Sequence, residues 1–257
     1  MIRKATPMVF RGLASLLVIG AAASAQAGAI QYVTPDGSKT KDGDVKAEAF
    51  FTLGNGSLQL TLTNLFANLT SDGQQISAIT FKVGGATGSG ALTTTGSGLI
   101  STISKGGAYT AGKADSLERW DATQAGTSIS LTTLTGGKPN RLIIGPDDKG
   151  GFDPSLGKYS KANSSIIQHT PSALGTAIFD ILISGITESS VLSDVVFQFG
   201  TDAGQRLVTG ELVPPPEPTP SPVPEPSTFA LLGLGGLGIA ARACRRRKAA
   251  PTTDLNC

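Results

Sequence analysis

Several stretches between residues 45 and 199 alternate apolar and polar residues, which is typical of strands that bury one face. Leucines occupy every second position from 58 to 62, within a predicted strand at Ser57–Leu65. Another predicted strand, Val45–Leu53, precedes it, and Asn55-Gly56 lies between the two. Because Asn and Gly accept positive φ angles, this dipeptide favours a type I′ turn. The pattern therefore predicts a β-hairpin.

The rest of this region predicts more short strands separated by turns. Strands are expected at Ile76–Val83, Thr127–Leu134, Arg141–Ile144, Thr176–Ile183 and Val191–Phe199. Gly84–Gly98 is rich in Gly, Ser and Thr and predicts a long loop or a weak edge strand, and Gly145–Gly157 predicts a turn-rich loop. Asp115–Ala125 alone has a trace of helical periodicity. Many short strands predict an all-β domain, built as a β-sandwich or a jelly roll.

The first residues have the features of a secretory signal peptide. Arg3, Lys4 and Arg11 precede an uncharged apolar run at 12–23, and Ala25-Gln26-Ala27 offers a cleavage site after Ala27. The run is short for a span of the bilayer, which takes roughly 20 residues, so a retained anchor is the weaker alternative. The sequence therefore predicts export by the Sec translocon and cleavage by signal peptidase.

The last residues form three segments of contrasting composition. Pro214–Pro226 is rich in proline and predicts an extended linker. Phe229–Ala241 is apolar and uncharged, and predicts a single short transmembrane helix. A basic stop cluster follows, made of Arg242, Arg245, Arg246, Arg247 and Lys248. Because such clusters stay on the cytoplasmic side, the β domain is expected outside.

This order of motif, apolar run and basic cluster resembles the PEP-CTERM sorting signal. The motif itself is Val223, Pro224, Glu225, Pro226, Ser227 and Thr228. The resemblance implies a substrate of exosortase, a membrane protease of Gram-negative bacteria that make extracellular polysaccharide, with a cut near Pro226. It also implies a transient membrane anchor and final display at the cell surface or outside the cell. The same segment occurs at the end of some ice-binding proteins.

The expected domains follow from these segments. They are a signal peptide at 1–27, a β-sandwich ectodomain at 28–213, a Pro-rich linker at 214–226, a sorting signal at 227–248 and a cytoplasmic tail at 249–257. Several short runs of the ectodomain, including Ala49–Leu53 and Phe197–Thr201, resemble a domain that is common ahead of PEP-CTERM tails. That family implies no activity.

Charge and cysteine content narrow the function classes. The chain has 21 basic and 19 acidic residues. Residues 1–27 and 227–257 together hold eight of the basic and one of the acidic residues. The remaining part has 13 basic and 18 acidic residues, a net charge of −5. Nucleic-acid binding needs a basic face and is therefore disfavoured. Cys244 and Cys257 both lie outside the ectodomain, so no disulfide is expected within it.

Candidate chemical sites are few, and each has a structural alternative. His169, the single histidine, suits a general base or a turn in which it bonds to the backbone. Asp147, Asp148 and Asp153 share one loop and are weak candidates for calcium, although Asp beside Gly or Pro is also ordinary turn chemistry. No catalytic residue and no cofactor are predicted.

Two further patterns have both a ligand-binding and a structural interpretation. Trp120 lies between Glu118 and Asp121, which suits a sugar platform, but a tryptophan buried in the core is the plainer alternative. Residues 233–238 match G-x-G-x-x-G, yet the segment before them is rich in proline instead of being a strand, and arginines soon follow. Glycines that let a membrane helix pack closely against its neighbours are the structural alternative.

The preferred hypothesis is an exported, non-catalytic protein with a structural or adhesive role in an extracellular matrix. An alternative is a carbohydrate- or ice-binding module, with extracellular polysaccharide as a candidate partner. It is motivated by Thr61 and Thr63 and by the run Thr93–Thr95. A secreted hydrolase is the second alternative, with His169 and the loop at 147–153 as its candidate residues.

Overall fold

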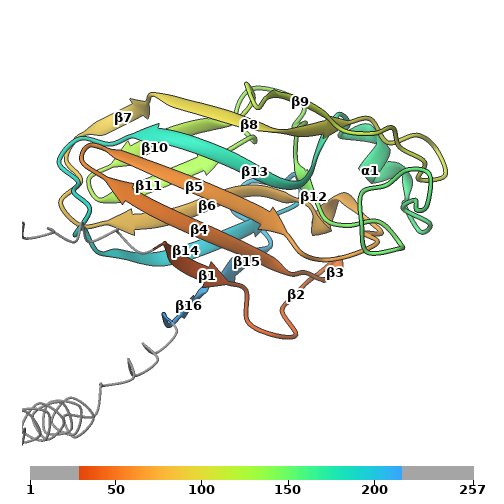
Figure 1. The fold of residues 1–257 in the computed structure, drawn as a ribbon, viewed down its shortest axis with the longest axis horizontal. Helices are drawn as coiled ribbons and strands as arrows, with labels where there is room; N and C mark the ends of the chain where they lie inside the picture. The colour runs from red at the N-terminus through yellow and green to blue at the C-terminus, as the bar shows by residue number, and fades with distance from the viewer. Residues whose placement is uncertain (1–28, 216–257) are drawn as a thin grey trace, which may run out of the picture. The chain divides into compact units, whose positions relative to one another are not determined.

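The computed structural model describes residues 29–215, and within them the fold is all-β (Figure 1). The signal segment, the PEP-CTERM motif, the apolar run, the basic cluster, the glycine motif and both cysteines lie outside these residues. The elements are β1 (Ile30–Val33), β2 (Lys39–Thr40), β3 (Gly43–Asp44), β4 (Ala47–Gly54), β5 (Ser57–Asn64), η1 (Asp72–Gln74), β6 (Ile76–Val83), β7 (Ser89–Leu92), β8 (Thr94–Ser101), β9 (Lys113–Ser116), β10 (Asp121–Ala125), β11 (Ser128–Thr132), β12 (Ile143–Ile144), α1 (Ser164–Gln168), β13 (Ser172–Leu182), β14 (Leu192–Phe199), β15 (Leu207–Thr209) and β16 (Glu211–Val213).

The strands pair in two series that β12 joins. In one series β13 pairs with β5 on one side and with β8 on the other, which gives the order β16-β1-β4-β5-β13-β8-β9. In the other, β6 pairs with β14 and β11, which gives β15-β14-β6-β11-β10-β7. The connecting strand β12 pairs with β13 in parallel and with β6 through Ile143 and Ile76. Neighbours within each series are antiparallel.

One hydrophobic core takes side chains from both series. The alternating leucines of β5 are buried in a single cluster with Phe51 of β4, Phe81 of β6, Phe179 of β13, and Phe197 and Phe199 of β14. Phe51 of β4 meets Phe81 of β6 edge to face, with ring centroids 5.0 Å apart. Because alternate residues of a strand point to opposite faces, a strand with period-two patterning places its apolar side chains in this core.

The predicted hairpin is present, but its turn differs from the expected type. β4 and β5 pair from Ala47–Asn64 to Gly54–Ser57, which leaves Asn55 and Gly56 as a two-residue loop. Gly56 has a φ of +77°, whereas Asn55 is not among the residues with positive φ. A type I′ turn needs positive φ at both central residues, so the type I′ prediction is wrong.

Gly84–Gly98 contains β7 and the first part of β8 rather than one long loop, and β7, which within residues 29–215 pairs with β10 alone, is a short edge strand as the other alternative expected. β8 lies inside its series, between β13 and β9. Its glycines allow close packing, because a Cβ atom on Gly96 would lie 2.8 Å from the ring of Phe179. Composition alone indicated a loop here, while the packing of small residues against large ones produces a strand.

Other elements also differ from those predicted. Asp115–Ala125 is not helical and contains the end of β9 and all of β10. The strand expected at Arg141–Ile144 has only the two residues of β12, and Arg141 has a φ of +57°. The short helix α1 was not predicted, and the side chain of Asn163 caps it by accepting a hydrogen bond from the Ser165 amide.

The described chain begins and ends on adjacent strands. β1 and β16 pair in antiparallel register, with Gln31 opposite Val213. Figure 1 shows α1 and the longer loops at the end of the strands opposite the β4–β5 turn, and the start and end of the described residues, at β1 and β16, lie nearer to that turn. No helix within residues 29–215 has the length and apolar character needed to cross a membrane.

Candidate functional site

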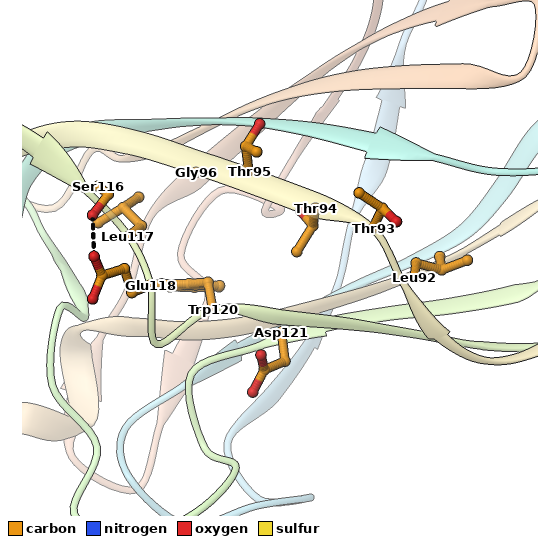
Figure 2. Close-up of a pocket in the computed structure, with 10 residues that line it drawn as sticks. All are labelled: Leu92, Thr93, Thr94, Thr95, Gly96, Ser116, Leu117, Glu118, Trp120 and Asp121. Carbon is orange, nitrogen blue, oxygen red and sulfur yellow. Dashed lines mark hydrogen bonds between the residues drawn. The ribbon is translucent and has the colours of Figure 1, made fainter.

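The most distinctive candidate site is a hollow between β8 and the segment that joins β9 to β10. Its volume is about 410 Å³, within the range typical of small-molecule sites. It is lined by Leu92, Thr93, Thr94, Thr95, Gly96, Ser116, Leu117, Glu118, Trp120 and Asp121 (Figure 2). The structure therefore brings Thr93–Thr95 together with Glu118, Trp120 and Asp121, two groups that the sequence offered separately.

The floor of the hollow belongs to the protein core. Trp120 is 3% exposed and packs against Phe179, with ring centroids 5.0 Å apart. Its indole Nε1 donates a 2.9 Å hydrogen bond to the carbonyl oxygen of Arg141. An indole this deeply buried has no free face on which a sugar ring can stack. Trp120 is therefore a core residue, as the plainer alternative expects.

The two carboxylates of the hollow are each held by a neighbouring hydroxyl group. Ser116 donates a 3.0 Å hydrogen bond to Glu118, which Figure 2 shows as a dashed line. Thr135 donates to Asp121 Oδ2. In the part of the chain that the structure describes, neither carboxylate is in an ion pair with Lys or Arg. The hollow is thus acidic and suits ligands that donate hydrogen bonds.

The loop that carries the calcium candidates is built around one buried carboxylate. Asp147 is 1% exposed and accepts a 2.6 Å hydrogen bond from the hydroxyl of Tyr109. The same carboxylate accepts from the backbone amides of Lys149 and Gly151. Burial, and then the hydrogen bond to Asp147, raise the pKa of Tyr109.

The other two aspartates of this loop, Asp148 and Asp153, accept hydrogen bonds that stabilise other turns. Asp148 accepts a hydrogen bond from the Lys158 amide, and this bond lowers the pKa of Asp148. Asp153 accepts from the hydroxyl and amide of Ser155, which lower its pKa. Among residues 29–215, no group of three or more His, Cys, Asp or Glu side chains is arranged to hold a metal ion.

His169 follows α1 and has structural contacts. Its Nδ1 lies 2.8 Å from the carbonyl oxygen of Pro139, and its Nε2 lies 4.0 Å from Asp72 Oδ2. Asp72 in turn accepts a hydrogen bond from Thr201. The contact with a backbone carbonyl is the one that the structural alternative for this residue expects.

The threonines that motivated ice binding lie on the outward side of β5, in mixed surroundings. The cross-strand neighbours of Thr61 are Phe50 and Ile178. Those of Thr63 are Glu48 and Thr176, and the hydroxyls of Thr63 and Thr176 are 3.1 Å apart. The two rows therefore combine threonine with aromatic, aliphatic and charged residues instead of repeating it.

Comparison with known proteins identifies one segment of the chain. The PEP-CTERM protein-sorting motif matches residues 222–247, which include the predicted motif, the apolar run and most of the basic cluster. Neither the curated proteins nor the solved structures contain a match to this chain. The motif supports export, exosortase as the processing partner and anchoring through the C-terminal segment at the cell surface. The chain therefore carries a PEP-CTERM protein-sorting motif at residues 222–247.

Proposed function

We propose that this chain is an exported, non-catalytic protein with a structural or adhesive role in an extracellular matrix. The observation that carries the proposal is the sorting motif at 222–247. In this proposal the Sec translocon exports the chain, signal peptidase cuts after Ala27, and the segment at 229–241 anchors it in the membrane as a short helix. Exosortase then cuts near Pro226, and the β domain remains at the surface or in the matrix.

The domain that would be displayed is, in this proposal, a β-sandwich. Two observations support it: the strands pair in two series, and the series share one core. The Phe51–Phe81 contact between β4 and β6 joins one series to the other. A sandwich needs no ligand to fold, which suits a durable structural module.

The sorting step is tested by replacing the motif in the native host. Alanines in place of Pro224, Glu225 and Pro226 are expected to leave the C-terminal segment attached, and the intact mass of the recovered protein measures this. The chain offers a matched control, because Pro216, Glu217 and Pro218 repeat the same three residues outside the matched segment. Alanines there are expected to leave processing unchanged. Equal processing of both variants and the wild type contradicts the proposal.

The non-catalytic role is tested with the matrix itself. Deleting residues 30–213 while keeping both targeting segments is expected to weaken matrix cohesion, measured by the shear needed to detach cells. A His169→Ala variant is expected to keep wild-type cohesion if it folds, which circular dichroism checks. Loss of cohesion with a folded His169→Ala variant would favour the hydrolase alternative.

Carbohydrate binding in the hollow is a second candidate function. It is favoured because Thr93–Thr95, Glu118 and Asp121 line one acidic cavity that suits hydroxyl donors. Trp120 is the single tryptophan of the chain, so its fluorescence reports on this hollow alone. A neutral galactose or mannose tetrasaccharide is expected to change that emission saturably. Glu118→Gln is expected to weaken the response, whereas Glu188→Gln, in a turn far along the chain, serves as the matched control.

A further inference from the structure

Four exposed lysines are carried by loops beside α1. They are Lys105, Lys149, Lys158 and Lys161, and we call residues 104–108 and 147–162 the lysine loops. These loops hold four lysines and three aspartates, of which Asp147 is buried. The other described residues hold nine basic and thirteen acidic side chains. The lysine loops are therefore net positive on a domain whose remainder is negative.

Backbone hydrogen bonds hold the lysine loops against each other. The Tyr159 amide donates to the carbonyl oxygen of Gly107 at 3.0 Å, which joins the loop of Lys105 to that of Lys158. The Asp148 amide donates to the carbonyl oxygen of Lys158, and the Lys158 amide donates to Asp148 Oδ1, both at 3.0 Å. These bonds place the four lysines within a few residues of common junctions.

A small hydrophobic cluster fixes the loops from beneath. Tyr109 and Tyr159 are buried in it with their ring centroids 5.4 Å apart. Tyr159 donates a 2.8 Å hydrogen bond to the carbonyl oxygen of Gly145, and Tyr109 donates to Asp147. The backbone that carries the lysines is thus ordered before any partner arrives, which lowers the entropic cost of binding.

Four lysines elsewhere in the domain have charge partners that the lysines of the lysine loops lack. Lys39 is in an ion pair with Asp44, Lys41 with Asp202, Lys46 with Asp36 and Lys82 with Asp194. Lys113 and Lys138, which also lie outside the lysine loops, are in no ion pair within residues 29–215. Across residues 29–215, none of the four lysine-loop ammonium groups lies within ion-pair distance of a carboxylate. Their charge is therefore available to a partner.

We propose that the lysine loops bind an anionic polysaccharide through its carboxylate groups. This inference rests on the proposed export, which places the domain where such polymers occur. The four exposed charges are spread over two loops that hydrogen bonds join, so they suit repeated contacts along a polymer. The two ends of the described chain lie nearer to the β4–β5 turn than to these loops (Figure 1), so a domain held by either end leaves the lysine loops accessible.

The test measures binding of the full chain to polygalacturonate by isothermal titration calorimetry, at low and at high salt. In the test variant Lys105, Lys149, Lys158 and Lys161 are all replaced by Gln. In the matched control, Lys39, Lys41, Lys46 and Lys82 are replaced by Gln, which removes the same total charge. We expect the test variant to lose at least about tenfold in affinity and the control to stay within about twofold. Binding of the wild type should weaken as salt rises.

Four results overturn the inference. They are no binding of polygalacturonate by the wild type, equal loss in both variants, binding of a neutral galactan that the test variant loses to the same extent, and tighter binding of duplex DNA or anionic lipid vesicles. Export is scored separately by fractionating the native host. Surface display without polygalacturonate binding rejects only this inference, whereas binding by a chain that stays in the cytoplasm rejects only the proposed function.

Discussion

The hydroxyl of Tyr109 donates a 2.6 Å hydrogen bond to the carboxylate of Asp147, and both side chains are buried. The tyrosine lies between β8 and β9, whereas the aspartate follows β12 by three residues. This single bond therefore ties two loops that are 38 residues apart in the chain. No cation accompanies the carboxylate in the described residues, so hydrogen-bond donors alone stabilise its charge.

Tyr109→Phe is expected to lower the free energy of unfolding by about 2 kcal/mol, because a buried carboxylate loses a donor. Tyr32→Phe is the matched control, since the Tyr32 hydroxyl donates at 3.0 Å to the neutral carbonyl of Leu192. Its expected loss is about 1 kcal/mol. Urea unfolding measures both variants. A loss at Tyr109 no larger than the loss at Tyr32 would show that the charge of Asp147 adds nothing.

Alkaline pH is expected to destabilise the domain through Tyr109 and Tyr159. Burial raises the pKa of both phenols above the ordinary value of 10.0, so the folded state keeps protons that the unfolded chain releases. Their stabilising contribution is complete below about pH 10 and falls above it by about 1.4 kcal/mol per pH unit for each tyrosine. Urea unfolding between about pH 8 and pH 11 measures the slope. The Tyr109→Phe variant should show a shallower decline, and an unchanged slope contradicts the assignment.

Gly157→Ala is expected to destabilise the domain by about 2 to 3 kcal/mol, because a methyl group there would overlap the Asp147 carboxylate. Gly151→Ala is the matched control in the same loop, since its methyl group would have no neighbour within 4 Å. Thermal unfolding of the two variants measures the difference. Similar melting temperatures would mean that the Asp147 carboxylate can move aside.

Gly56→Ala is expected to cost about 1 to 2 kcal/mol, because Gly56 has a φ of +77° and an L-residue is strained there. Added volume plays no part, since its methyl group would meet nothing within 4 Å. Asn55→Ala is expected to cost well under about 1 kcal/mol, because Asn55 does not have positive φ. Equal losses of stability at both positions would instead support a type I′ turn, in which both residues have positive φ. Chemical denaturation of both single variants measures the costs.

Period-two patterning predicted the strands whose alternate side chains fill the core. Ile76–Val83 matches β6 at both ends, and Ser57–Leu65 exceeds β5 by one residue. In each case every apolar residue is buried, and one polar residue is buried with them, Asn64 in β5 and Ser77 in β6. Such strands are predictable because local pattern and tertiary burial agree. The sorting signal was predictable for another reason, since its order of motif, apolar run and basic cluster is contiguous in sequence.

The elements that were missed depend on contacts distant in sequence. β8 is rich in glycine and threonine, and it is a strand because Gly96 fits against Phe179 of β13. The hollow could not be foreseen, since Thr94 and Glu118 come together only through the pairing of β8 with β9. Asp147 was a calcium candidate because it shares a loop with Asp148 and Asp153, and the loop itself could not reveal its Tyr109 donor, which lies 38 residues away. Nothing in the sequence indicates that Tyr109 donates a hydrogen bond to this carboxylate.

The pairing of β1 with β16 has a mechanical consequence. The two strands share three residue pairs, and the pair Gln31–Val213 lies where the chain leaves the domain. A pull on the chain beyond Val213 therefore loads this pair first and peels β16 from β1 one pair at a time. The strands that fill the core carry no direct load at that stage. Under tension β16 therefore detaches before the rest of the domain, and it pairs with β1 again when the tension ends.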